Sequence, residues 1–178
     1  MTVRGPCRIL LIGMMGSGKS TIGELLSTAT GWPYVDNDEL VRRSHGATVR
    51  EIAAEQGEDE MRAAEADALA LGVDLAPPAM VGVAAGTILD PINRDRMRTD
   101  GIVVWLRADP AVLSSRAMGG DHRPFLGRGG EGWMRDTAAE RDPLYASVAD
   151  IVFDTGAGSA ADSAAEILAR LRTIESCA

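Results

Sequence analysis

The sequence has little of what marks a secreted, membrane or nucleic-acid-binding protein. Its two cysteines, Cys7 and Cys177, lie near opposite ends, so we expect no disulfide framework and a reducing compartment, the cytoplasm. No apolar run approaches a membrane span, and the first residues lack the apolar core of a signal peptide. Lys and Arg number 18 against 26 Asp and Glu, and the net charge of −8 argues against a nucleic-acid partner.

The rest of the composition is that of one ordinary globular domain. The chain has 178 residues, of which 46% are hydrophobic and 25% charged, and this length suits a single domain over 1–178 with one good core. In so acidic a protein, any anion site has to be built locally from Lys, Arg and backbone amides. Each Arg in a predicted loop therefore carries weight as a candidate ligand.

Residues 13–20, GMMGSGKS, match the phosphate-binding loop pattern at every fixed position. An apolar strand is predicted at 8–12 before this loop, and a helix opens at Thr21 after it. The alternative, a glycine-rich turn that binds nothing, requires all these features to coincide by chance. We therefore expect a nucleoside triphosphate here, held by backbone amides and the helix N-terminus. The expected nucleotide contacts are Gly16, Ser17, Gly18, Lys19, Ser20 and Thr21, with Ser20 also a Mg²⁺ ligand.

Strands and helices alternate along the whole sequence. Further buried strands are predicted at 32–36, 79–84, 102–106 and 150–153, and helices at 48–56, 60–75, 131–145 and 160–174. Asp90 and Asp109, each followed by proline, open two more helices. A glycine-rich segment at about 119–130 reads as a mobile lid. The pattern predicts a three-layer α/β/α domain with a parallel sheet.

Two carboxylates, Asp36 and Asp38, follow the second predicted strand at the edge where the phosphate loop also lies. In a strand, side chains two residues apart point the same way. One carboxylate could hold Mg²⁺ or its waters, and the other could bind and deprotonate an acceptor hydroxyl. The alternative, that Asp38 only caps the following helix, stays open.

Three arginines are candidates for anion binding. Arg62 is placed to pair with Glu65 one helical turn on, although a solvated surface pair is the favoured alternative. Arg123 lies in the predicted lid, where an arginine suits phosphoryl transfer. Arg141 lies at a predicted helix end, where it could instead complement the helix dipole.

Together these residues resemble the shikimate kinases, small P-loop kinases built like the nucleoside monophosphate kinases. The resemblance runs from Ile9 to about Leu171 and rests on five motifs in order: GMMGSGKS at 13–20, DND at 36–38, GEDEMR at 57–62 with Glu65, RPFL at 123–126 and RDPLY at 141–145. It implies a five-stranded parallel sheet in the order 2-3-1-4-5, a lid over the nucleotide, and an acceptor-binding helical region at about 38–66.

The resemblance also implies a role for each candidate. Arg62 and Arg141 grip a substrate carboxylate, a task that suits the guanidinium fork, and Asp38 binds the acceptor hydroxyl. Asp36 joins Ser20 in the Mg²⁺ shell, and Arg116 lies against the nucleotide base. The implied catalytic set is Lys19, Asp38 and Arg123, and the implied acceptor contacts are Asp38, Arg62, Ala85, Gly86 and Arg141.

The sequence departs from the family pattern in the acceptor pocket. The family ends its third strand in three glycines whose amides approach the substrate, and here 84–86 reads AAG. Side chains at Ala84 and Ala85 narrow the allowed backbone angles and occupy space beside the substrate. Two phenylalanines of the family pocket are replaced by Ala53 and Met61. These changes affect the acceptor half and leave the ATP half intact.

We therefore expect an ATP- and Mg²⁺-dependent kinase that phosphorylates a hydroxyl on a small carboxylated molecule, with shikimate to shikimate 3-phosphate, a step of aromatic amino acid biosynthesis, as the leading reaction. A gluconate-type or cyclitol kinase on the same scaffold is the nearer alternative. An inactive nucleotide-binding regulatory module is the alternative from another class. The expected partners are ATP and the acceptor, in a monomer, with a homodimer left open.

Overall fold

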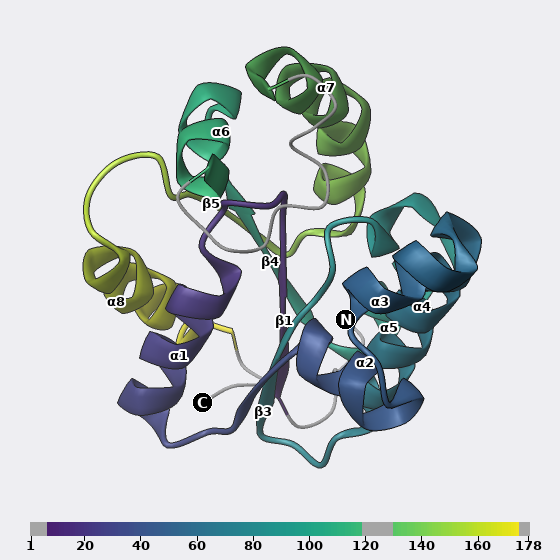
Figure 1. The fold of residues 1–178 in the computed structure, drawn as a ribbon. Helices are drawn as coiled ribbons and strands as arrows, with labels where there is room; N and C mark the ends of the chain where they lie inside the picture. The colour runs from purple at the N-terminus through teal and green to yellow at the C-terminus, as the bar shows by residue number, and fades with distance from the viewer. Residues whose placement is uncertain (1–6, 119–129, 175–178) are drawn as a thin grey trace.

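Five parallel strands form one sheet in the computed structural model, which describes residues 7–118 and 130–174 (Figure 1). The sheet order is β2-β3-β1-β4-β5, which confirms the predicted order. Each neighbouring pair is parallel. The strands are β1 (Arg8–Ile12), β2 (Tyr34–Asp36), β3 (Ala79–Gly82), β4 (Ile102–Arg107) and β5 (Ile151–Asp154).

Helices connect the strands and cover the sheet. They are α1 (Lys19–Thr30), α2 (Asn37–His45), α3 (Val49–Gln56), α4 (Glu58–Asp74), α5 (Pro91–Asp100), α6 (Pro110–Met118), α7 (Gly130–Val148) and α8 (Ala160–Leu171), with a short 3₁₀ turn η1 (Thr87–Leu89). Their starts follow local chemistry. Thr48 and Ser159 each form a capping box. Asp90 accepts a hydrogen bond from the amide of Ile92 behind the proline that opens α5.

The alternation of side chains along β1 divides the core into two layers. Ile9 and Leu11 pack with apolar residues of α1 and α8, on one face of the sheet. Leu10 and Ile12 pack with residues of α2, α3, α4 and α7 on the other. Figure 1 shows α1 and α8 side by side on one face and the α2–α5 group on the opposite one. Burial on both faces explains why the strands are almost continuously apolar.

The carboxyl ends of the strands meet at one edge of the sheet, and the candidate residues follow these ends. The phosphate loop follows β1, Asp36 ends β2, residues 84–86 follow β3, and Thr155 follows β5. In an open parallel sheet this edge is where ligands bind. The topology therefore brings together motifs that are far apart in the sequence.

Asp36 and Asp38 do not lie on one strand, so the expected strand alternation does not place them. Asp36 ends β2 and is the N-cap of α2, where its carboxylate accepts a hydrogen bond from the amide of Asp38. Asp38 is in the first turn of α2. Capping is thus the work of Asp36, and Asp38 is free for another role.

Other boundaries also differ from expectation. Strand β3 ends at Gly82, two residues early. Helix α7 continues through Pro143 to Val148, so Arg141 lies inside the helix and is not a C-terminal dipole partner. Helix α8 ends at Leu171, not at residue 174. The predicted lid, with Arg123, falls outside the described residues.

Cys7, just before β1, is disulfide-bonded. This bond is contrary to the reducing compartment that the low cysteine content indicated. Among residues 7–118 and 130–174, no helix combines the length and the apolar character of a membrane span.

Candidate active site

The loop between β1 and α1 has the shape that its sequence predicts. Gly13 and Gly16 have φ of 141° and 81°, a region that favours glycine. Space requires glycine as well. A β-carbon would lie 2.4 Å from the Leu106 carbonyl oxygen at Gly13 and 2.5 Å from the Leu113 carbonyl oxygen at Gly16. The loop is therefore packed directly against the chain around β4 and α6.

Lys19 lies over this loop at the start of α1. Its Nζ donates hydrogen bonds to the carbonyl oxygens of Gly13, at 2.9 Å, and Met14, at 3.1 Å. Burial lowers the pKa of Lys19 to about 8, against the opposing effect of Asp36 and Asp38. The Lys19 ammonium group is thus poorly solvated in the protein without a ligand, and a bound polyanion would stabilise its charge.

Ser20 and Asp36, the two expected Mg²⁺ ligands, are hydrogen-bonded to each other beside the loop. The Ser20 hydroxyl donates to Asp36 Oδ2 at 2.8 Å, and the Tyr34 hydroxyl donates to the same oxygen at 2.8 Å. Burial, followed by the Asp36 charge, raises the pKa of Tyr34, so the phenol keeps its proton and donates. Within the described part of the chain, no group of three or more His, Cys, Asp or Glu could hold a metal alone. Mg²⁺ is commonly bound by one or two protein oxygen ligands together with phosphate oxygens of the nucleotide. A carboxylate and a hydroxyl fit this pattern.

Arg62 on α4 is fixed by two carboxylates of its own helix. Its Nη1 lies 2.9 Å from Glu65 Oε2, and its Nη2 lies 3.2 Å from Glu58 Oε1. The Glu65 side chain is 9% exposed and that of Arg62 is 28% exposed, so this is not the solvated surface pair favoured as the alternative. Burial raises the pKa of Glu65 and the Arg62 charge opposes it. The guanidinium is held at a partly buried place beside the cavity.

Arg141 on α7 converges on the segment after β3. Its Nη1 donates to the carbonyl oxygen of Ala85 at 3.3 Å, and the Tyr145 hydroxyl donates to the same oxygen at 2.8 Å. Nε of Arg141 is buried and has no hydrogen-bond partner among residues 7–118 and 130–174. Tyr145 is itself fixed by stacking on Trp105, with ring centroids 5.6 Å apart. The role of Tyr145 was not predicted, although it stands in the RDPLY motif.

The two alanines of the 84–86 segment fit the backbone without strain. No described residue other than glycine has a positive φ, so Ala84 and Ala85 adopt backbone angles open to any residue. The 84–86 segment therefore keeps its place beside the cavity.

Arg116 on α6 is tied to the loop after β5. Its Nη2 donates to the carbonyl oxygen of Thr155 at 2.7 Å. The buried Thr155 hydroxyl in turn donates to the carbonyl oxygen of Ser17, at 3.1 Å, within the phosphate loop. Thr155, which the sequence patterns did not single out, thus links the phosphate loop to the arginine expected at the nucleotide base.

One cavity of about 720 Å³ joins these parts. Its volume is within the usual range of pockets that bind small molecules. Of the predicted residues, those that line it are Gly16, Gly18, Lys19, Ser20, Thr21, Asp36, Asp38, Arg62, Ala85, Gly86, Arg116 and Arg141. Ser17 is fully buried beneath the loop and Arg123 lies outside the described residues. Lining residues that were not predicted include Arg42, Arg50 and Trp133.

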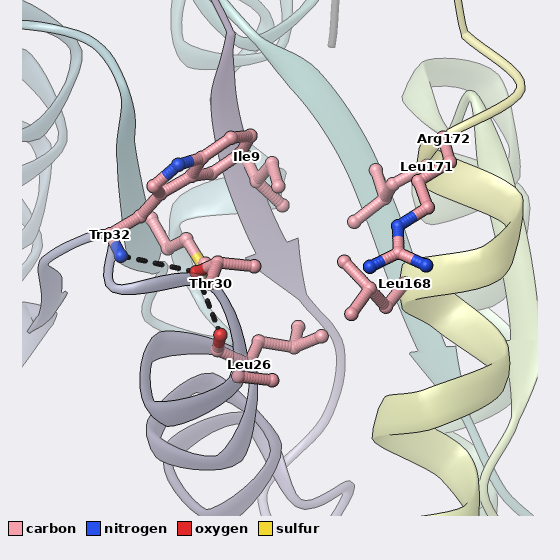
Figure 2. A pocket seen from close by; sticks show the side chains of 9 residues that line it. Ile9, Leu26, Thr30, Trp32, Leu168, Leu171 and Arg172 are labelled. Carbon is pink, nitrogen blue, oxygen red and sulfur yellow. Dashed lines mark hydrogen bonds between the residues drawn. The ribbon is translucent and has the colours of Figure 1, made fainter. Parts of the chain in front are cut away.

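A second cavity, of about 260 Å³, lies at the opposite edge of the sheet, between α1 and α8 (Figure 2). Ile9, Leu26, Leu168 and Leu171 form much of its wall, and Arg172 is the one charged residue among the described residues that line it. The Thr30 hydroxyl beside it is satisfied, since it donates to the Leu26 carbonyl oxygen and accepts from the Trp32 amide. The described residues that line this cavity include no carboxylate, histidine or phosphate loop, so they do not offer the groups for phosphoryl transfer.

Comparisons with known proteins agree on one family. The shikimate kinase family model matches residues 15–172. The chain is 39% identical to a shikimate kinase of Symbiobacterium thermophilum over 92% of this chain and 95% of that one. It is 41% identical to a shikimate kinase of Moorella thermoacetica over 94% and 95%. A solved structure, the shikimate kinase from Acinetobacter baumannii in complex with shikimate, matches with a TM-score of 0.89 and 31% identity, over 97% of this chain and 96% of that one.

Proposed function

The chain belongs to the shikimate kinase family and is an ATP-dependent kinase, and from this premise we propose that it phosphorylates shikimate to shikimate 3-phosphate. The observation that carries the proposal is the single cavity in which Lys19 meets Asp38, Arg62 and Arg141. A cation for phosphates, a carboxylate for a hydroxyl and two guanidinium groups for a carboxylate are what this reaction requires. The relatives, similar over nearly their whole length, support the same acceptor.

The nucleotide half binds the triphosphate of ATP at the phosphate loop. Lys19 and Arg123 stabilise the negative charge on the transferred group, and Arg116 lies against the base. Ser20 and Asp36 hold Mg²⁺, which neutralises phosphate charge when bound. Because burial already strips water from Lys19, its charge acts on the phosphates at short range and with little reorganisation.

The acceptor half binds and orients the alcohol. Arg62 and Arg141 hold the carboxylate through charge-assisted hydrogen bonds. Glu65 keeps Arg62 in place by accepting a hydrogen bond from its Nη1. Asp38 accepts a hydrogen bond from the reacting hydroxyl and takes up its proton as the oxygen attacks. The carbonyl oxygen of Ala85, held by Arg141 and Tyr145, sets the position of the segment that faces the acceptor.

We propose one domain over 1–178, with a lid at about 119–130 and an acceptor region at about 38–66. The proposed state is a monomer, and neither nucleic acid nor membrane is a proposed partner. We also propose a cytoplasmic location, where ATP is available. The disulfide at Cys7 is the one observation that does not favour that location.

A coupled ADP-release assay tests the function. Purified protein is given Mg²⁺ and ATP with shikimate, with gluconate, with a cyclitol or with no acceptor. We expect ADP release that depends on shikimate. Turnover with gluconate or with the cyclitol, but not with shikimate, would mean that shikimate is not the acceptor. Nucleotide binding without turnover on any of them would mean a regulatory module instead of an enzyme.

A further inference from the structure

We infer that Tyr34 is a positioning residue that holds the Asp36 carboxylate in the orientation needed for Mg²⁺. This inference rests on the proposed pairing of Ser20 and Asp36 at the metal. Tyr34 is one of only two tyrosines in the chain, and its side chain lies next to Gly23 of α1 and Gly82 of β3. It does not line the cavity beside Lys19.

Three donors fix the two oxygens of Asp36. Oδ2 accepts from the Tyr34 hydroxyl and from the Ser20 hydroxyl, each at 2.8 Å. Oδ1 accepts from the amide of Asp38 at 3.2 Å. These donors come from β2, α1 and α2, so the carboxylate is tied to three elements at once. It therefore has little freedom to rotate.

Two glycines make room for the Tyr34 ring. A β-carbon at Gly23, on α1, would lie 2.2 Å from Tyr34 Cε2, and one at Gly82, on β3, would lie 2.3 Å from the Tyr34 hydroxyl oxygen. Neither glycine has a positive φ, so the backbone does not require glycine at either position. The space is used by Tyr34, which is wedged between α1 and β3 and reaches Asp36 as a rigid donor.

The Tyr34 hydroxyl differs from the other donor to Oδ2. Ser20 is itself a proposed metal ligand, whereas the Tyr34 hydroxyl donates to Asp36 without being a proposed ligand. Partners that hydrogen-bond to a metal ligand fix its direction, and their loss typically weakens metal binding about 10- to 100-fold. Without the Tyr34 hydroxyl, the one remaining donor to Asp36 Oδ2 would be Ser20, which is itself proposed to bind the Mg²⁺ ion.

The test compares the two tyrosines of the chain. In Tyr34→Phe the ring stays and only the hydroxyl is lost. Calorimetry measures the affinity for a non-hydrolysable ATP analogue in EDTA and in excess Mg²⁺. The ratio of the affinity in Mg²⁺ to the affinity in EDTA is the metal-dependent gain in nucleotide affinity. We expect Tyr34→Phe to lower this gain about tenfold, to leave the affinity in EDTA unchanged, and to raise the Mg²⁺ concentration for half-maximal rate by a similar factor. Tyr145→Phe, the matched control, removes a hydroxyl that contacts the Ala85 carbonyl oxygen and Met14 Sδ but not Asp36, and it should leave the gain unchanged.

Gly82→Ala is the second variant. Its β-carbon would displace the Tyr34 hydroxyl, so it should reproduce the loss of metal-dependent gain in the wild-type background. In a Tyr34→Phe background it should add little, since the hydroxyl that its β-carbon would meet at 2.3 Å is gone and the remaining contacts, with Asp36 Oδ2 and the ring carbon Cζ, are at 3.2 Å. An unchanged gain in both Tyr34→Phe and Gly82→Ala, or equal losses with and without Mg²⁺, would overturn the positioning role alone. A wild-type protein with no metal-dependent gain would overturn the metal assignment and the inference with it.

Discussion

The guanidinium of Arg62 lies directly against Gly86, so closely that a β-carbon built there would be 1.5 Å from Arg62 Nη1. The same β-carbon would be 3.1 Å from Glu65 Oε2. Gly86 has an ordinary φ of −84°, so its backbone does not require glycine. The lack of a side chain instead leaves space for the Arg62 guanidinium. Of the residues at 84–86, this is the position where glycine is needed, and alanine is tolerated at the other two.

Gly86→Ala should weaken acceptor binding selectively. The methyl group forces Arg62 away from its position, which removes a charge-assisted contact to the carboxylate worth about 1.5–3 kcal/mol, or about 10- to 100-fold in affinity. Steady-state kinetics should show that rise in the Michaelis constant for shikimate, with the constant for ATP nearly unchanged. Ala85→Gly, next to it in the chain, should behave like wild type. A Gly86→Ala enzyme with an unaltered shikimate constant would remove Arg62 from the acceptor site.

Asp38→Asn should reduce turnover by about 10²–10⁴ while ATP binding stays nearly constant. The amide keeps the size of the side chain but cannot accept a proton from the acceptor hydroxyl. Because Asp36 and not Asp38 caps α2, the variant should fold normally. Turnover and ATP affinity are measured on the same preparation, with Asp59→Asn, at an exposed position of α4, as the control. Near-normal turnover would exclude Asp38 as the base.

The affinity for nucleotide should fall as the pH rises above about 8. Burial lowers the pKa of Lys19 to about 8, and phosphate charge raises it again on binding. Below that pH the ammonium is charged in both states and affinity is constant. Above it the free protein has lost a proton that the complex retains, so affinity falls by up to about tenfold per pH unit. Calorimetry between pH 7 and 9.5 measures this fall, together with proton uptake. In Lys19→Arg the side chain stays charged throughout, and the pH dependence should disappear. A flat wild-type profile would show that the Lys19 pKa is not lowered.

Thr155→Val should destabilise the fold. The substitution keeps the shape of the side chain and removes the hydroxyl that donates to the Ser17 carbonyl oxygen. A buried acceptor left without its donor costs about 1–3 kcal/mol of the free energy of unfolding. Urea unfolding measures the loss. Thr155→Ser, which keeps the hydroxyl and loses only a methyl group, should lose less. Equal losses in the two variants would mean that the hydrogen bond contributes nothing.

Local patterns predicted much of this molecule. The phosphate loop and the strand order follow from short motifs and from the family resemblance they carry. The supporting contacts were beyond such patterns, because they join residues distant in the chain. Tyr145 and Ala85 are 60 residues apart, and Thr155 and Ser17 are 138 apart. The role of Asp38 was ambiguous for a different reason. A helix that begins one residue after a short strand cannot be told from a longer strand by alternation alone.

The most direct test of the account is the pair of Michaelis constants of Arg62→Ala. The central claim is that the cavity beside Lys19 holds a carboxylate-bearing alcohol by its arginines. The variant should raise the constant for shikimate about 10- to 100-fold and leave the constant for ATP nearly unchanged. A rise of the same size in both constants would contradict the claim.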